Sequence, residues 1–184
     1  MILPATVGRT GGLCMPCKQG IRGNIEASKR RYEEQKKYDP YRELWSSLVQ
    51  RVHKTDEGFE GLSPEERLYF AVGILDGEVH NGGFHQFFWN SSGGYYRYAA
   101  SGLDELGAGQ ALELLQRAKE IAFGDKPPPL DWKERRTFLV NSDSGKRLET
   151  LDELDPAFWQ ESKTLNDKLA RFAVEKGLIA PFQK

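Results

Sequence analysis

The sequence predicts an all-α domain. In several segments apolar residues recur every three or four positions, which is the spacing of one helix face. A capping residue followed by proline opens helices at Asp39-Pro40, Ser63-Pro64 and Asp155-Pro156. No segment shows the convincing alternation of apolar and polar residues that marks a half-buried strand. The chain has 184 residues, 39% of them hydrophobic, which is enough for one compact core.

The first 37 residues differ in character from the rest. Residues 1–23 contain five Gly, two Pro and both Cys without apolar periodicity, so they are expected to form a loose arm. Asn24 is placed to cap a helix to about Lys37 that is polar on every side and only marginally stable. We therefore divide the chain into a basic, Cys-containing arm with a marginal helix (1–37) and a domain (38–184).

The domain begins with two strong helix predictions. From Asp39-Pro40 to about Lys54, one face carries the stripe Tyr41, Leu44, Trp45, Leu48, Val49 and Val52. Ser63 and Glu66 then form a capping box that opens a central helix through Val79. In this central helix Gly73 and Gly77 allow a close neighbour, and Gly82-Gly83 is expected to end it.

Shorter helices follow. They are expected from Phe84 to about Asn90, over 95–106, over 112–123 with a stop at Gly124, over 132–140, and from Asp155-Pro156 to Gly177. Residues 127–129 are three prolines and predict a stiff connector. Residues 141–145 predict a loop.

The formal net charge of −1 hides an uneven distribution. Residues 1–54 carry +6, residues 55–123 carry −7, and residues 124–184 are neutral. The longest apolar runs are far below the roughly 18 to 20 residues that cross a bilayer. No apolar block follows a basic start as in a secretory signal. We expect a cytoplasmic protein without a membrane partner.

Cys14 and Cys17 are spaced like a redox pair or half of a zinc site. Structural zinc needs four ligands, and His53, His80 and His85 are all more than thirty residues away. No βαβ pattern supports a redox motif. A reduced, unliganded pair is favoured over metal binding and redox chemistry, so we expect neither a metal nor a cofactor.

Polar residues cluster around Gly82-Gly83 and are compatible with acid-base chemistry. They are Glu78, His80, Asn81, His85 and Gln86. No nucleophile, phosphate-binding loop or metal spacing accompanies them, so a satisfied structural network is favoured. The predicted structural motif consists of Glu78, Asn81, Gly82, Gly83, Phe84, Phe87, Phe88 and Asn90.

The stretch Lys29 to Lys37 is basic and is a candidate for contact with nucleic-acid phosphates. Glu33 and Glu34 interrupt it, and no DNA-reading motif follows. A solvated helix face is favoured, without direct nucleic-acid binding.

Carboxylates are dense in three places, where they serve either solubility or binding of a partner. Five of them fall within eleven residues without an intervening base. The candidate acidic face consists of Asp56, Glu57, Glu60, Glu65, Glu66, Asp104, Glu105, Glu149, Asp152, Glu153 and Asp155.

The order of motifs resembles a bacterial family of α-helical DNA-mimic proteins. The resemblance spans about Tyr38 to Lys176 and rests on Leu62 to Glu66, Glu78 to Ser91, Leu103, Gly107, Ala118, and Leu151 to Asp155 before Phe158. Its most specific part is the block from Asn81-Gly82-Gly83-Phe84 to Asn90-Ser91. The resemblance implies an all-α homodimer whose carboxylates imitate duplex phosphates and occupy the DNA-binding surface of a helix-turn-helix repressor.

The sequence therefore favours a non-enzymatic regulatory protein that binds a DNA-binding protein through an acidic face. One alternative is an interaction or immunity-type module without DNA mimicry. The other alternative is a hydrolase that uses Glu78, His80 and His85.

Overall fold

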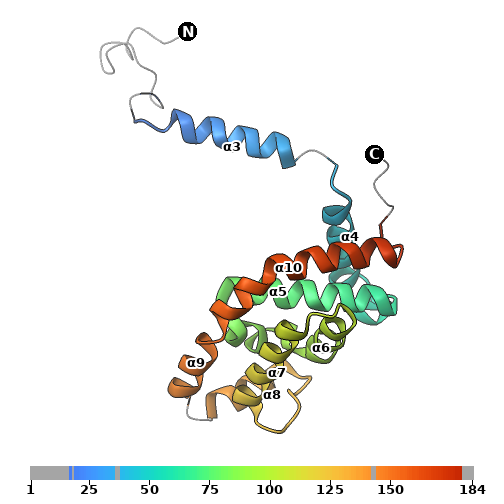
Figure 1. Ribbon diagram of the computed structural model, residues 1–184, viewed down its shortest axis with the longest axis vertical. Coiled ribbons are helices and arrows are strands. Elements are labelled where there is room, and N and C mark those ends of the chain that lie inside the picture. Colours follow the sequence, from blue (N-terminus) through green and yellow to red (C-terminus); the bar gives the residue numbers. More distant parts are fainter. Residues whose placement is uncertain (1–16, 18, 36–37, 142–143, 180–184) are drawn as a thin grey trace. The chain divides into compact units, whose positions relative to one another are not determined.

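The computed structural model describes residues 17, 19–35, 38–141 and 144–179, and the chain divides into two units, Met1–Asp39 and Pro40–Lys184. Within the second unit the described residues form seven α-helices and no strand, which confirms the predicted all-α class (Figure 1). Across these described ranges no helix is long and apolar enough to cross a membrane.

The first unit contains helix α3 (Arg22–Gln35). This helix begins two residues before Asn24, so Asn24 lies in its first turn and does not cap it. Ile21, Ile25 and Tyr32 are 37–60% exposed, and Arg22 pairs with Glu26 one turn later at 3.8 Å. The mostly solvated surface agrees with the predicted polar helix.

Helices α4 (Pro40–Lys54) and α5 (Pro64–Trp89) begin at the predicted prolines, with the short 3-10 helix η1 (Gly58–Gly61) between them. The capping box of α5 is present, because Ser63 Oγ accepts from the Glu66 N–H at 3.2 Å and Glu66 Oε2 accepts from the Ser63 N–H at 2.8 Å. A Cβ added to Gly73 would lie 2.6 Å from the Trp45 ring. Gly73 thus permits the predicted close approach of a neighbour, whereas no atom lies within 4 Å of a Cβ at Gly77.

The helical geometry of α5 is interrupted at Gly82-Gly83, where the backbone angles are non-helical, and a second helical segment follows to Trp89. The predicted stop at this glycine pair and the predicted short helix from Phe84 are therefore confirmed. Gly83 has a φ of 73°, in the left-handed region that favours glycine. A Cβ on Gly83 would lie 2.0 Å from Asp155 Oδ2, so the side chain of Asp155 fills the space at the bend. The chain resumes its helix because the rings of Phe84, Phe87 and Phe88 beyond the bend are fully buried.

Six further elements complete the second unit: η2 (Ser91–Tyr95), α6 (Tyr96–Glu105), α7 (Gly109–Phe123), α8 (Trp132–Asn141), α9 (Ser144–Asp152) and α10 (Asp155–Glu175). The predicted loop over 141–145 is wrong at both described ends, since Asn141 belongs to α8 and Ser144 opens α9. Helix α9 buries Leu151, and this burial offsets the weak helix propensity of Ser144-Gly145.

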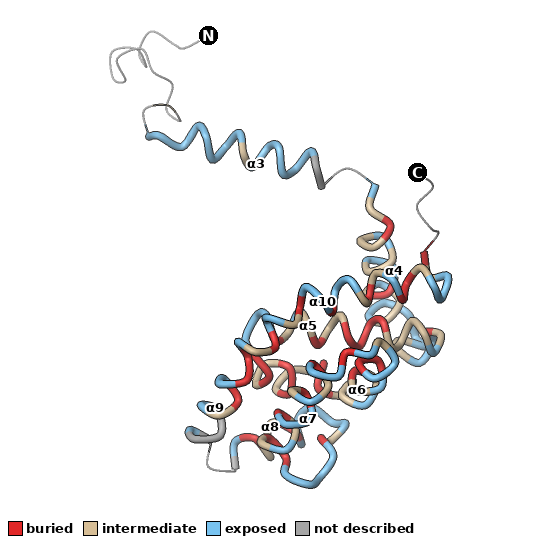
Figure 2. Tube along the Cα trace, in the orientation of Figure 1, coloured by how far each residue is buried: buried red, intermediate tan, exposed pale blue. Residues whose placement is uncertain are grey.

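The core surrounds α5, where buried residues are concentrated (Figure 2). Helix α6 packs closely because Gly102 faces Val72, whose Cγ2 would lie 2.6 Å from a Cβ at that glycine. Helices α7, α9 and α10 contribute Leu115, Leu151, Phe158 and Leu165, all at most 1% exposed. This packing fixes the start of α5 and its bend, near which the candidate acidic residues lie.

Candidate functional site

The structure divides the candidate acidic residues between the start of α5 and the region of its bend at Gly82-Gly83. The first set, the α5-start acidic group, lies on the turn before η1, on η1, at the start of α5 and at the C-terminal ends of α6 and α10. It consists of Asp56, Glu57, Glu60, Glu65, Glu66, Asp104, Glu105 and Glu175. The second set, the α9 acidic group, consists of Glu149, Asp152 and Glu153, all exposed. The sequence had suggested one acidic face, and the structure separates it into two groups.

Two carboxylates of the α5-start acidic group are committed to arginines. Glu66 accepts two hydrogen bonds from Arg51, at 2.5 and 2.9 Å, and this bidentate contact lowers the pKa of Glu66 below its ordinary value. Glu60 pairs with Arg67 at 2.9 Å, although 71% of its side chain is exposed. Glu66 therefore secures η1 and α4 to the start of α5, and Glu60 remains accessible to a partner.

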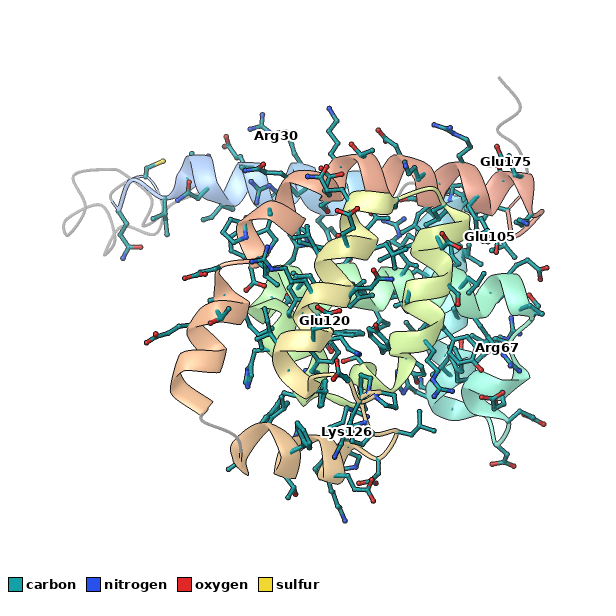
Figure 3. The ribbon with its side chains drawn as sticks, turned by 60° about the horizontal axis from the view of Figure 1, so that its bottom comes forward. Arg30, Arg67, Glu105, Glu120, Lys126 and Glu175 are labelled. Atoms are coloured by element: carbon teal, nitrogen blue, oxygen red, sulfur yellow. The ribbon has the colours of Figure 1, made fainter. Side chains whose placement is uncertain are left out.

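Lys176 joins the C-terminal ends of α6 and α10. Its Nζ lies 2.7 Å from Glu105 Oε1, and this hydrogen bond raises the pKa of Lys176, with smaller contributions from the charges of Glu65 and Glu175. Glu105 and Glu175 lie at the same edge of the domain (Figure 3). Glu175 was missed at the sequence level because it stands beside Lys176, which cancels its charge in any local count.

Asp155 does not belong to either surface group. It is 6% exposed, and its Oδ1 accepts a hydrogen bond from the buried Phe84 N–H at 3.0 Å. Burial raises the pKa of Asp155, while the bond from Phe84 opposes that shift. The expectation that Asp155 contributes to an acidic surface is therefore wrong, because its position at the α5 bend takes it out of solvent.

The net charge of −1 combines two units of opposite sign. Residues 40–184 contain 18 Lys and Arg against 23 Asp and Glu, a formal charge of −5. Residues 1–39 contain 8 Lys and Arg against 4 Asp and Glu, a formal charge of +4. The domain that carries the carboxylate groups is thus distinctly acidic.

Glu78 is the centre of a closed polar network. Its carboxylate accepts from Gln86 Nε2 at 2.6 Å, from Asn90 Nδ2 at 3.0 and 3.2 Å, and from Ser92 Oγ at 2.9 Å. Ser92 also donates to the Phe87 carbonyl at 3.2 Å. Both oxygens of Glu78 are therefore used to fix the end of α5 against η2, as the structural interpretation of the sequence predicts.

The two histidines beside this network make other contacts. His80 Nδ1 lies 2.9 Å from the Asp76 carbonyl oxygen, one turn earlier on α5. His85 lies against Trp89, with ring centroids 5.5 Å apart, and burial lowers its pKa. Among the described contacts, neither histidine shares a hydrogen bond with Glu78. Asn81, which belongs to the predicted motif, is exposed.

Arg135 is a buried residue that sequence reasoning missed. Its guanidinium is 0% exposed and donates to the carbonyls of Phe88, Asn90 and Ser91 at the end of α5 and the start of η2, at 2.6–3.2 Å. It also donates to the carbonyls of Pro129 and Leu130 at 2.8 Å. These acceptors are main-chain groups, so no sequence pattern reveals them. Arg135 ties α8 and the proline connector to the end of α5.

The N-terminal candidates fall largely outside the described residues. Cys14 lies outside them, whereas Cys17 Sγ accepts a hydrogen bond from Arg22 Nε at 2.8 Å. Of the basic stretch, Lys29 to Arg31 are exposed on α3, and residues 36–37 lie outside the described part. Within the part of the chain that the structure describes, no three His, Cys, Asp or Glu side chains are grouped as metal ligands.

The fold and these surfaces define an all-α protein that presents grouped carboxylates and whose polar network at Glu78 is closed on itself. A family model described as DMP19-like protein matches residues 60–176, which is more than half of the chain. The chain belongs to the DMP19-like family, a family of DNA mimics. The match begins within η1 and runs to the end of α10, so it begins later than the resemblance seen in the sequence. No curated protein and no solved structure matches the chain.

Proposed function

We propose that this protein is a non-enzymatic regulator that occupies the DNA-binding surface of a DNA-binding protein, such as a helix-turn-helix repressor. The observation that carries this proposal is the placement of two carboxylate groups, one at the start of α5 and one beside its bend at Gly82-Gly83. Membership of the DMP19-like family supports the same role.

The spacing of the two groups supports an imitation of duplex phosphates. From Glu65 to Gly83, beside which the α9 acidic group lies, α5 advances eighteen residues, or about 27 Å at 1.5 Å per residue. Phosphates along one DNA strand repeat every 3.4 Å or so, so 27 Å corresponds to about eight nucleotides. This length fits one half-site of an operator, which is read within about one helical turn.

The number of carboxylates indicates that a second copy contributes. Without Glu66 the two groups supply ten surface carboxylates, whereas a duplex of about 27 Å carries about 16 phosphates. A homodimer in the cytoplasm would present twice as many carboxylates and would match a two-fold symmetric partner. We include the homodimer in the proposal, and sedimentation of the purified protein tests it.

Charge reversal of each group tests the proposed function. The immobilised protein is exposed to a lysate of its source, and retained DNA-binding proteins are identified. The first variant carries Asp56→Lys, Glu57→Lys and Asp104→Lys, and the second carries Glu149→Lys, Asp152→Lys and Glu153→Lys. These positions are exposed and avoid the Arg51–Glu66 contact, so the fold is expected to persist.

A matched variant with Glu113→Lys, Asp125→Lys and Asp167→Lys changes the net charge equally at exposed positions outside both groups. The proposal requires that both group variants lose the retained protein and that the matched variant keeps it. Equal retention by all three variants would contradict it.

An interaction module without DNA mimicry is favoured by a different surface. Arg136 lies between Trp89 and Trp132, with its guanidinium 4.8 and 4.6 Å from the two ring centroids. Trp132 is 42% exposed; Leu130, just before α8, and Val140, near the end of α8, are 76% and 59% exposed. Tryptophan and arginine are enriched among the residues that dominate protein interfaces. In the capture experiment, loss of the partner only with Trp132→Ala would favour this second function.

A further inference from the structure

A cleft of about 350 Å³ lies between α4, α5 and α10 and is used by neither the acidic groups nor the Glu78 network. Its lining includes the aromatic rings of Tyr41, Trp45 and Tyr69, together with Asp76, Asn166 and Ala170. This lining combines three aromatic residues with one carboxylate, that of Asp76, and includes no Lys, Arg or His. The cleft lies within the second unit, whose elements α4, α5 and α10 are shown in Figure 1.

The aromatic wall is held rigidly. The Trp45 ring stacks on Phe70, with centroids 5.4 Å apart and planes inclined by 19°. The same ring fits against Gly73, where a Cβ would approach it to 2.6 Å. Because Phe70 is fully buried and Gly73 has no side chain, the indole has a fixed position before any ligand arrives.

Asp76 supplies one oriented negative charge. Its Oδ1 accepts a hydrogen bond from Ser162 Oγ at 2.8 Å and lies 3.5 Å from His80 Nδ1. Asn166 in turn donates to Ser162 Oγ at 3.3 Å. Both contacts of the carboxylate use Oδ1, so among the described residues Oδ2 has no hydrogen-bond partner. The side chain of Asp76 is 17% exposed, so a ligand can reach it while solvent screening is reduced.

We propose that this cleft binds the cationic side chain of an arginine or lysine from a protein partner. Aromatic rings attract a cation through their faces, and a carboxylate with an uncommitted oxygen accepts its N–H donors. A DNA-binding surface is rich in such side chains, so the assignment of the cation to a protein partner rests on the proposed function. The chemistry of the cleft rests only on its own residues.

Two small probes test the chemistry of the cleft in the full chain. N-acetyl-arginine amide carries the guanidinium, and N-acetyl-citrulline amide has nearly the same shape without the charge. Titrations followed by amide and indole NMR signals are expected to give saturable shifts at Trp45, Gly73 and Asn166 with the arginine probe and at least tenfold weaker effects with the citrulline probe. Equal binding of both probes would overturn the proposal.

Two variants assign the binding to the cleft. Asp76→Asn retains an acceptor for Ser162 but removes the charge, and we expect about tenfold weaker binding of the arginine probe, the change that 1.4 kcal/mol produces. Ala170→Lys places a cation at the lining without touching the Asp76–Ser162 bond and is expected to abolish binding. Asp125→Asn, an exposed carboxamide substitution elsewhere, is the matched control and is expected to bind normally. Unchanged binding by both cleft variants would contradict the proposal.

Two further experiments distinguish binding in the cleft from binding at the acidic groups, and a protein side chain from a free small cation. The triple variant at Asp56, Glu57 and Asp104 is expected to bind the arginine probe normally, since it leaves the cleft intact. Loss of probe binding in this variant would place the probe on the acidic surface and would contradict the cleft as its binding site. Titration with choline is the second experiment. If choline binds more than tenfold more tightly than the arginine probe, the cleft serves a free small cation and the assignment to a protein side chain is wrong.

Discussion

The buried carboxylate of Asp155 accepts the N–H of Phe84 at 3.0 Å and so joins the first turn of α10 to the bend of α5, 71 positions earlier in the chain. The bend supplies the donor because Gly83 releases the helix from its regular geometry. The first turn of α10 supplies a favourable environment for an anion, since a helix N-terminus carries partial positive charge. One side chain therefore fixes the relative position of the two longest helices of the domain.

This contact predicts a difference between two substitutions. Asp155→Ala leaves the buried Phe84 N–H without an acceptor and is expected to lower the free energy of unfolding by about 1 to 3 kcal/mol. Asp155→Asn keeps an acceptor oxygen and is expected to cost less. Urea unfolding of both variants measures the difference, and equal losses would show that the hydrogen bond is not what stabilises the bend.

The same carboxylate predicts a pH effect. Burial raises the pKa of Asp155 in the folded state above that in the unfolded state, so this group contributes stability at low pH and loses that contribution as the pH rises through the folded pKa. We therefore compare the free energy of unfolding of the wild type with that of Asp155→Asn at two pH values. The stability of the wild type relative to the variant is expected to be greater at pH 4 than at pH 7. A difference that grows in the opposite direction would contradict the raised pKa.

The Glu78 network predicts a structural cost. Glu78→Ala removes the shared acceptor of Gln86, Asn90 and Ser92 and is expected to cost about 2 to 3 kcal/mol, because several partly buried donors lose their partner. Glu113→Ala, at an exposed position of α7, is expected to stay within about 0.5 kcal/mol of the wild type. Thermal unfolding compares the two variants, and similar stabilities would contradict a structural role for Glu78.

Arg135 predicts a distinction between two basic side chains. Lysine cannot reproduce the fork that donates to five carbonyls, so Arg135→Lys is expected to destabilise the domain by about 3 kcal/mol or more. Arg97→Lys, exposed on α6, is the matched control with an expected change within about 0.5 kcal/mol. A near-neutral Arg135→Lys would mean that the buried guanidinium does not hold α8 to α5.

Much of the fold could be predicted from the sequence because periodicity and capping are local signals. The stripe containing Trp45 and Leu48 and the capping box at Ser63 placed α4 and α5 with their starting residues. Helix α9 was missed because the residues over 141–145 favour a turn locally, while Leu151 is buried by contacts distant in sequence. Local pattern cannot report such long-range burial.

The candidate site was less predictable for the same reason. Spacing alone assigned Asp155 to an acidic surface, but its carboxylate lies at a bend formed by a distant glycine pair. Arg135 gave no signal, since its acceptors are main-chain carbonyls. Charge density along the sequence placed the acidic residues on one face, whereas their division between the start of α5 and its bend depends on how α6, α9 and α10 pack against α5.

Direct competition with duplex DNA tests whether the carboxylate groups imitate DNA. A DNA-binding protein retained by this chain is mixed with a fluorescent duplex of its own site, and the anisotropy of the duplex is followed as this protein is added. We expect the wild type to displace the duplex completely, and at least as effectively at 200 mM as at 50 mM salt, because the duplex releases more counterions and loses affinity more steeply than a folded carboxylate surface. The charge-reversed variant Asp56→Lys, Glu57→Lys, Asp104→Lys is expected not to displace it. A ternary complex in which the duplex stays bound, or displacement that the reversed charges leave unchanged, would contradict the imitation of DNA.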